Sequence, residues 1–176
     1  MRVLIVHNRY QQAGGEDMVV ALEAQMLREA GHEVTLAEVN NDGISGFAEK
    51  ARTLLRTPYD STRRGWMAEA VKAANAEVVH IHNFFPRLTP AVHDGAAATG
   101  AAVVQTLHNY RLICAGALLM RDGHVCEDCL TGNRLSGVVH RCYRGSVAGS
   151  GKNVRASGSV LESGVAGNTV SLVPAY

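Results

Sequence analysis

The 176-residue sequence lacks a strong charge of either sign, a long apolar run and the common nucleotide-binding fingerprints. Its net charge of +1 gives no electrostatic basis for binding nucleic acid or an anionic membrane surface. No apolar run approaches the roughly 20 residues of a transmembrane helix, so we expect no membrane span. Neither G-x-G-x-x-G nor G-x-x-x-x-G-K-S/T is present, which argues against NAD-dependent oxidoreductases and P-loop enzymes.

Other signals are absent as well. The sequence has no nucleophile elbow, no H-E-x-x-H motif and no evident Ser-His-Asp arrangement. Arg2 comes early and no small-residue cleavage site follows, so we expect no secretory signal peptide. Cysteine is missing from the first 113 residues. Without a secretory context, we expect reduced thiols and a cytoplasmic location.

Apolar, β-branched runs alternate with helical patterns through the first part of the chain. We expect strands at Arg2–Val6, Glu33–Val39, Glu77–His82 and Ala101–Leu107, and helices at Glu16–Ala30, Phe47–Arg56, Ser61–Ala74 and Pro90–Thr99. This alternation predicts an α/β fold, in which a Rossmann-like parallel sheet carries helices on both faces. Such sheets bind ligands outside the carboxyl ends of their strands.

Two features fall at that edge of the expected sheet. Gly14 and Gly15 separate the first strand from the first helix, where backbone N–H groups can bind a phosphate. An ordinary tight turn explains the glycine pair equally well. His-Asn pairs follow three strands: His7-Asn8, His82-Asn83 and His108-Asn109. We expect these histidines to converge on one crevice, although each by itself is as readily a loop residue held by hydrogen bonds.

The cysteines have a spacing that is compatible with a metal site. They are Cys114, Cys126, Cys129 and Cys142. The central C-x-x-C and its two outer partners could surround a structural Zn²⁺, with Asp122-Gly123 forming a turn before the pair. Four unrelated reduced thiols, or a redox pair at Cys126 and Cys129, are the alternatives. We therefore expect a domain over residues 1–146 with a cysteine-rich segment at 114–142. Over residues 147–176, rich in Gly and Ser, we expect a disordered tail.

Several stretches together resemble the N-terminal domain of family-four glycosyltransferases. They are residues 3–10 with Gly14-Gly15-Glu16, Val-Val-His-Ile-His-Asn-Phe-Phe-Pro at 78–86 and Val-Val-Gln-Thr-Leu-His-Asn-Tyr-Arg at 103–111. The stretches at 121–129 and 140–146 are similar to one branch of that family, so that the resemblance covers about residues 1–146.

The resemblance implies one half of a GT-B architecture, in which two Rossmann-like domains face each other across a cleft. It implies metal-independent, retaining transfer of a sugar from a nucleotide-sugar donor to a glycan or other acceptor, with no catalytic cofactor. Peripheral association with a membrane is compatible with it. By this resemblance His108 is the catalytic residue beside the transferred sugar, and Gly14 and Gly15 reach the donor diphosphate. The substrate-binding residues would be Glu16, His82, Asn83 and Asn109.

The sequence departs from the family pattern after residue 146. Family members continue with a second domain that carries most of the donor site, whereas this chain continues with a glycine-rich segment over 147–176. A truncated or frame-shifted gene, or a fragment, would explain the change. The alternative function is a non-catalytic Rossmann-like module that binds a glycan or a nucleotide. Reading the DNA downstream of codon 146 in all three frames would distinguish these cases.

Overall fold

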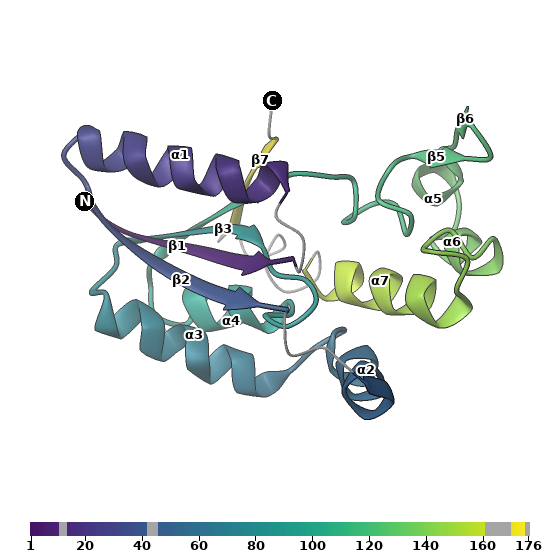
Figure 1. Cartoon of the computed structure of the whole chain (residues 1–176), viewed down its shortest axis with the longest axis horizontal. Helices are drawn as coiled ribbons and strands as arrows, with labels where there is room; N and C mark the ends of the chain where they lie inside the picture. Colours follow the sequence, from purple (N-terminus) through teal and green to yellow (C-terminus); the bar gives the residue numbers. More distant parts are fainter. Residues whose placement is uncertain (11–13, 42–45, 161–169, 175–176) are drawn as a thin grey trace.

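The computed structural model describes the chain except residues 11–13, 42–45, 161–169 and 175–176 (Figure 1). Five strands pair in parallel: β1 (Arg2–Arg9), β2 (Glu33–Asn40), β3 (Val78–Asn83), β4 (Ala102–Leu107) and β7 (Val170–Pro174). Their order in the sheet is β2-β1-β3-β4-β7. The first four match the strands expected from the sequence, so the predicted α/β, Rossmann-like fold is confirmed.

Helices cover both faces of this sheet. The longer ones are α1 (Gly15–Glu29), α2 (Gly46–Arg56), α3 (Ser61–Ala73), α4 (Ala91–Ala97) and α7 (Val147–Val160). Figure 1 shows α1 on one face, and α3 and α4 on the other. The four helices expected before residue 100 are therefore present. Over the described ranges, no helix is both long enough and apolar enough to cross a membrane.

β1 is buried on both faces, which explains its continuous apolar run. Val3 and Ile5 belong to a small hydrophobic cluster beneath α1. Leu4 and Val6 point to the opposite face and join the larger cluster that contains Met67 of α3. Successive side chains of a strand alternate between faces, so a strand between two helical layers needs apolar residues at every position.

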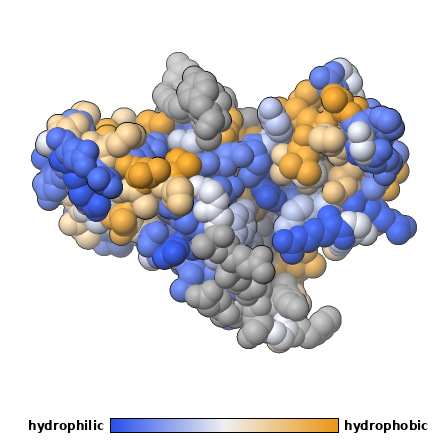
Figure 2. All heavy atoms as spheres, turned by 45° about the horizontal axis from the view of Figure 1, so that its top comes forward, coloured by the Kyte–Doolittle hydropathy of each residue, from blue (hydrophilic) through white to orange (hydrophobic). Residues whose placement is uncertain are grey.

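The apolar stripe of α1 faces solvent rather than the sheet. Its members are between 36% and 67% exposed, and they are Met18, Val19, Leu22 and Met26. Figure 2 shows apolar atoms gathered on this side of the molecule. The buried positions of α1 are Val20 and Ala24, and Asp17 and Glu23 also turn inward to pair with histidines of β1 and β3. The helix is oriented by these small and charged side chains, because the sheet beneath it carries polar groups.

The segment after residue 146 differs from the irregular tail expected from the sequence. α7 occupies Val147–Val160, and β7 adds a parallel strand beside β4. Glycine and serine are poor helix formers, but packing overrides that propensity here. The amide of Asn153 donates to the carbonyl of Ala115 at 3.1 Å, and the hydroxyl of Ser157 donates to that of Arg111 at 2.7 Å. Small residues let α7 lie close to the preceding segment. The remainder of this expected tail lies outside the described residues.

The cysteine-rich segment forms a small unit beside the sheet (Figure 1). It contains the hairpin of β5 (Met120–Arg121) and β6 (His124–Val125), followed by the short helices α5 (Asp128–Thr131) and α6 (Ser136–Val139). Asp122 and Gly123 both have positive φ, at 51° and 81°. This confirms the expected turn, because a two-residue hairpin turn of this type needs positive φ at both positions.

Candidate functional site

The carboxyl ends of β1, β3 and β4 bring three histidines to one edge of the sheet. His82 Nδ1 lies 3.1 Å from His108 Nε2, and the two rings are stacked with centroids 5.3 Å apart. The ring of His7 lies 6.4 Å from that of His82, measured between centroids. In the strand order, the chain leaves β1 for β2 on one side and returns to β3 on the other. Doubly wound sheets bind ligands at such a switch point.

The asparagines of the three His-Asn pairs have structural partners. Asn83 donates its side-chain N–H to the Asn8 carbonyl at 2.9 Å and accepts the Phe85 N–H at 3.1 Å. Asn109 accepts the Arg111 N–H at 3.0 Å. These bonds fasten the loops that follow the strands, as asparagine commonly does in turns. A substrate contact by Asn83 or Asn109 stays a prediction.

The fold itself does not explain the glycines at the start of α1. A Cβ added to Gly14 or Gly15 would meet no described atom within 4 Å. Gly14 has φ −127°, a conformation open to any residue. Its N–H donates to Asp17 Oδ2 at 2.7 Å, so that the acidic side chain already caps this helix end. The described part of the fold therefore does not require glycine at these positions.

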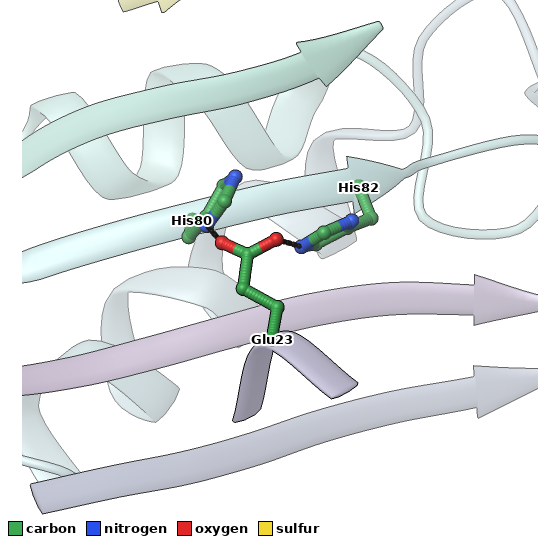
Figure 3. Close-up of side chains that lie close together, drawn as sticks. All are labelled: Glu23, His80 and His82. Carbon is green, nitrogen blue, oxygen red and sulfur yellow. Dashed lines mark ion pairs between the residues drawn. The ribbon is translucent and has the colours of Figure 1, made fainter. Parts of the chain in front are cut away.

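A layer of ion pairs lies between α1 and the sheet. Asp17 Oδ1 contacts His7 Nε2 at 3.0 Å. Glu23 contacts two histidines of β3, with Oε1 2.6 Å from His80 Nδ1 and Oε2 3.3 Å from His82 Nε2 (Figure 3). Neither Glu23 nor His80 belongs to the site expected from the sequence. The only sequence signal was His-Ile-His, which puts two histidines on the same face of a strand.

Burial keeps the two histidines at the sheet edge neutral. It lowers the pKa of His82 to about 3, with the neighbouring His80 adding to the effect and Glu23 opposing it. Burial also lowers the pKa of His108, against the opposing charge of Glu16. A neutral imidazole donates through one nitrogen and accepts through the other, so the contact between the two rings fixes their relative tautomers.

The same edge has a hollow of about 260 Å³ on the side of α2 and α3. The charged groups lining it are Arg52, Arg56, Arg63, Arg87, Glu49 and Asp60. Glu49 pairs with Arg87 at 3.2 Å, and Asp60 pairs with Arg56 at 3.4 Å. Four arginines against two carboxylates leave a positive lining, which suits an anionic group. The backbone N–H of Arg87 donates to Asn8 Oδ1 at 2.9 Å, which connects this hollow to the loop after β1.

The four cysteines are free thiols, and Cys114 is buried. Burial raises the pKa of Cys142, and the neighbouring Cys129 and Cys114 raise it further. Two glycines pack against cysteines: a Cβ on Gly137 would lie 3.3 Å from Cys129 Sγ, and one on Gly116 would lie 3.8 Å from Cys114 Sγ. Within the described ranges, however, the cysteines do not form a group of three ligand atoms all within 4.8 Å. Zinc binding by these residues stays a prediction.

No protein-family model, curated protein or solved structure matched the chain. What the site can do follows from its own chemistry. A helix start with open glycines, a neutral histidine pair and a cationic hollow meet at the carboxyl edge of one parallel sheet. Helix N-termini and arginines bind anions, and a neutral imidazole donates or accepts a hydrogen bond without adding charge. The arrangement suits a polar, phosphate-bearing ligand.

Proposed function

We propose that this chain is the acceptor-side domain of a retaining glycosyltransferase of GT-B architecture. The observation that carries the proposal is that the first turn of α1 contacts the histidine cluster at the switch point of a parallel sheet: Asp17 lies 3.0 Å from His7, whose ring is 6.4 Å from that of His82. The resemblance to family-four glycosyltransferases supports it independently. The substrates would be a nucleotide-sugar donor and a glycan acceptor, and the cationic hollow would take an anionic group of the acceptor.

Each group has a role in this reaction. As the bond to the sugar breaks, negative charge builds on the departing nucleoside diphosphate, and N–H groups at the start of α1 stabilise it. The absence of side chains at Gly14 and Gly15 lets the phosphates approach these groups. His108 would offer a hydrogen bond to the transferred sugar. Its lowered pKa keeps it neutral, and its contact with His82 fixes its orientation.

Donor binding by these residues alone is expected to be weak. Glu16 and Asp17 occupy the first turn of α1, where their charges oppose a phosphate. Backbone donors that face solvent are also weakened by its high dielectric constant. Transfer further requires that the donor be held in a closed, water-excluding cleft. We therefore expect no measurable sugar transfer by residues 1–176 and dissociation constants of about 1 mM or weaker for nucleotide sugars.

Replacing Gly15 by valine is expected to abolish this weak binding. The measurement is a heteronuclear NMR titration with UDP-glucose and GDP-mannose, in which the amides of Gly15 and Glu16 should shift for at least one ligand. A Cβ at Gly15 meets no described atom within 4 Å, so valine should block the phosphates while leaving the protein folded. The matched control is Gly65→Val in α3, where an added Cβ also meets no described atom within 4 Å.

Equal shifts in the wild type and Gly15→Val would contradict the diphosphate site. Efficient sugar transfer by the 176-residue chain alone would contradict the proposal that this chain supplies only one side of the active-site cleft. A donor-site domain supplied in trans or by fusion provides the final test. Turnover that depends on His108 supports the glycosyltransferase, whereas binding without turnover supports a non-catalytic module.

We also propose that Cys114, Cys126, Cys129 and Cys142 bind one structural Zn²⁺. Chain purified without chelators should hold close to one zinc on these thiolates, with sulfur–metal distances of about 2.3 Å. All four thiols should resist a thiol reagent until a chelator is added, since bound thiolates are not free nucleophiles. Cys129→Ser should lose both zinc and protection. A metal-free, folded chain whose four thiols react at once would exclude this site.

A further inference from the structure

A second group of metal-ligand side chains lies between α1 and β3. The ligand atoms of Glu23, His80 and His82 all lie within 4.8 Å of one another, and no other group of three in the described part of the chain meets that condition. Figure 3 shows both imidazoles turned toward the same carboxylate, each toward a different oxygen. The elements that carry them are independent of the cysteine-rich segment, so this cluster is a separate site.

One ligand atom of this cluster lacks a hydrogen bond. His82 Nε2 is buried and makes none with the described residues, although Glu23 Oε2 lies 3.3 Å away. A buried polar atom without a hydrogen bond is costly, and native structures usually satisfy it with water, a ligand or an ion. An orphaned nitrogen directed at a carboxylate is the arrangement expected where a cation bridges the two.

The outer nitrogens of both imidazoles already have partners. His80 Nε2 lies 2.7 Å from Thr106 Oγ1, and His82 Nδ1 lies 3.1 Å from His108 Nε2. Metal-binding histidines nearly always donate their second N–H to such a partner, which leaves the inner nitrogen deprotonated and facing the metal. With a metal bound, His80 would donate to Thr106 and His82 to His108, and both inner lone pairs would be directed at the metal.

We propose that Glu23, His80 and His82 bind a divalent transition metal of the Zn²⁺ type. Two imidazoles and one carboxylate suit zinc or cobalt, whereas Mg²⁺ and Ca²⁺ prefer sets of oxygen ligands. Tetrahedral zinc with bonds of about 2.0–2.2 Å spaces its ligand atoms by roughly 3.3–3.6 Å. The pair of His82 and Glu23 already has that spacing at 3.3 Å. His80 Nδ1 lies 2.6 Å from Oε1, the other oxygen of Glu23, so a carboxylate that binds through one oxygen must rotate, a side-chain adjustment.

The metal would connect α1 to the centre of the sheet. It would also hold His82 in the tautomer that donates to His108. In the proposed glycosyltransferase this makes it a positioning metal for His108, with no direct part in transfer. Three protein ligands leave a fourth position for water. Metal binding itself does not depend on the proposed function.

The test uses the full chain after removal of metals, with Co²⁺ and Zn²⁺ as probes. Cobalt at this site should give visible d–d absorption without thiolate charge-transfer bands. It should also broaden or shift the imidazole NMR signals of His80 and His82. Glu23→Gln and His80→Gln should each weaken Co²⁺ binding at this site at least tenfold. Glu29→Gln on the same helix and His124→Gln on the exposed hairpin are the matched controls and should bind normally.

Zn²⁺ should raise the melting temperature of the wild type more than that of Glu23→Gln. The imidazole signals of the unmodified chain keep the test decisive if a variant fails to fold. The proposal would be overturned if cobalt left the imidazole signals of His80 and His82 unchanged, or if it bound only through thiolates. None of these readouts depends on sugar transfer, so failure of the glycosyltransferase proposal would leave the result unaffected.

Discussion

Gly95→Ala is expected to lower the free energy of unfolding by about 2–3 kcal/mol. Gly95 lies in α4, where that helix rests directly on α3. A Cβ at this position would clash with the Arg64 carbonyl oxygen and would lie 2.9 Å from Met67 Cβ. The first contact is with backbone inside a helix, so the two helices must separate. Alanine's higher helix propensity, worth about 1 kcal/mol, offsets only part of that cost.

Gly65→Ala in α3 is the matched control. A Cβ at Gly65 meets nothing within 4 Å, so the same substitution should raise stability by about 0.5–1 kcal/mol. Urea unfolding followed by circular dichroism measures both variants. If Gly95→Ala proves as stable as Gly65→Ala, the close approach of α3 and α4 is wrong.

Acid is expected to destabilise the protein steeply, beginning near pH 6.5. His93 is fully buried, and its Nε2–H donates to Gln105 Oε1 at 2.9 Å. Burial lowers the pKa of His93, and it lowers that of His82 to about 3. In the unfolded chain both return to about 6.5 and take up protons that the folded state excludes. Stability is therefore fully present above pH 6.5 and falls as the pH drops below it.

The expected slope is about 1.4 kcal/mol per pH unit for each histidine kept neutral. Glu23 acts in the same direction at lower pH. Its interactions with His80 and His82 lower its pKa despite the opposing effect of burial, so its contribution is lost as the pH falls below its unfolded value of about 4.5. Urea titrations at several pH values, with a chelator present, measure the slope. His93→Gln should reduce the slope by the contribution of one histidine. A free energy of unfolding that stays constant between pH 7 and 5 would contradict the conclusion that the buried histidines are neutral.

The local signals in the sequence predicted the sheet well. Strands β1 to β4 are short apolar runs between helical patterns, and burial on both faces makes such runs recognisable without tertiary information. The crevice also followed from sequence order. Carboxyl ends of parallel strands share one edge, so His82 and His108 had to approach each other once the strands were identified.

Local sequence patterns did not predict the orientation of α1 or the regular structure after residue 146. The exposed stripe of Met18, Leu22 and Met26 has helical spacing, but spacing does not say which face of a helix meets the sheet. The histidines of β3 determine which face of α1 meets the sheet, because they pair with Glu23. α7 has poor intrinsic helix propensity, and its buried hydrogen bonds to the segment around Ala115 exist only in the assembled fold.

The sequence by itself therefore determined the α/β class, the first four strands and the edge where the histidines meet. Those features depend on local periodicity and on chain order. Only the tertiary structure brought Glu23, His80 and His82 together and gave Cys142 its electrostatic interactions with Cys129 and Cys114. Glu23 is 57 residues from His80, and no local pattern connects residues so far apart. Their contact arises from the way in which α1 packs on β3, an interaction between distant segments that the folded chain alone creates.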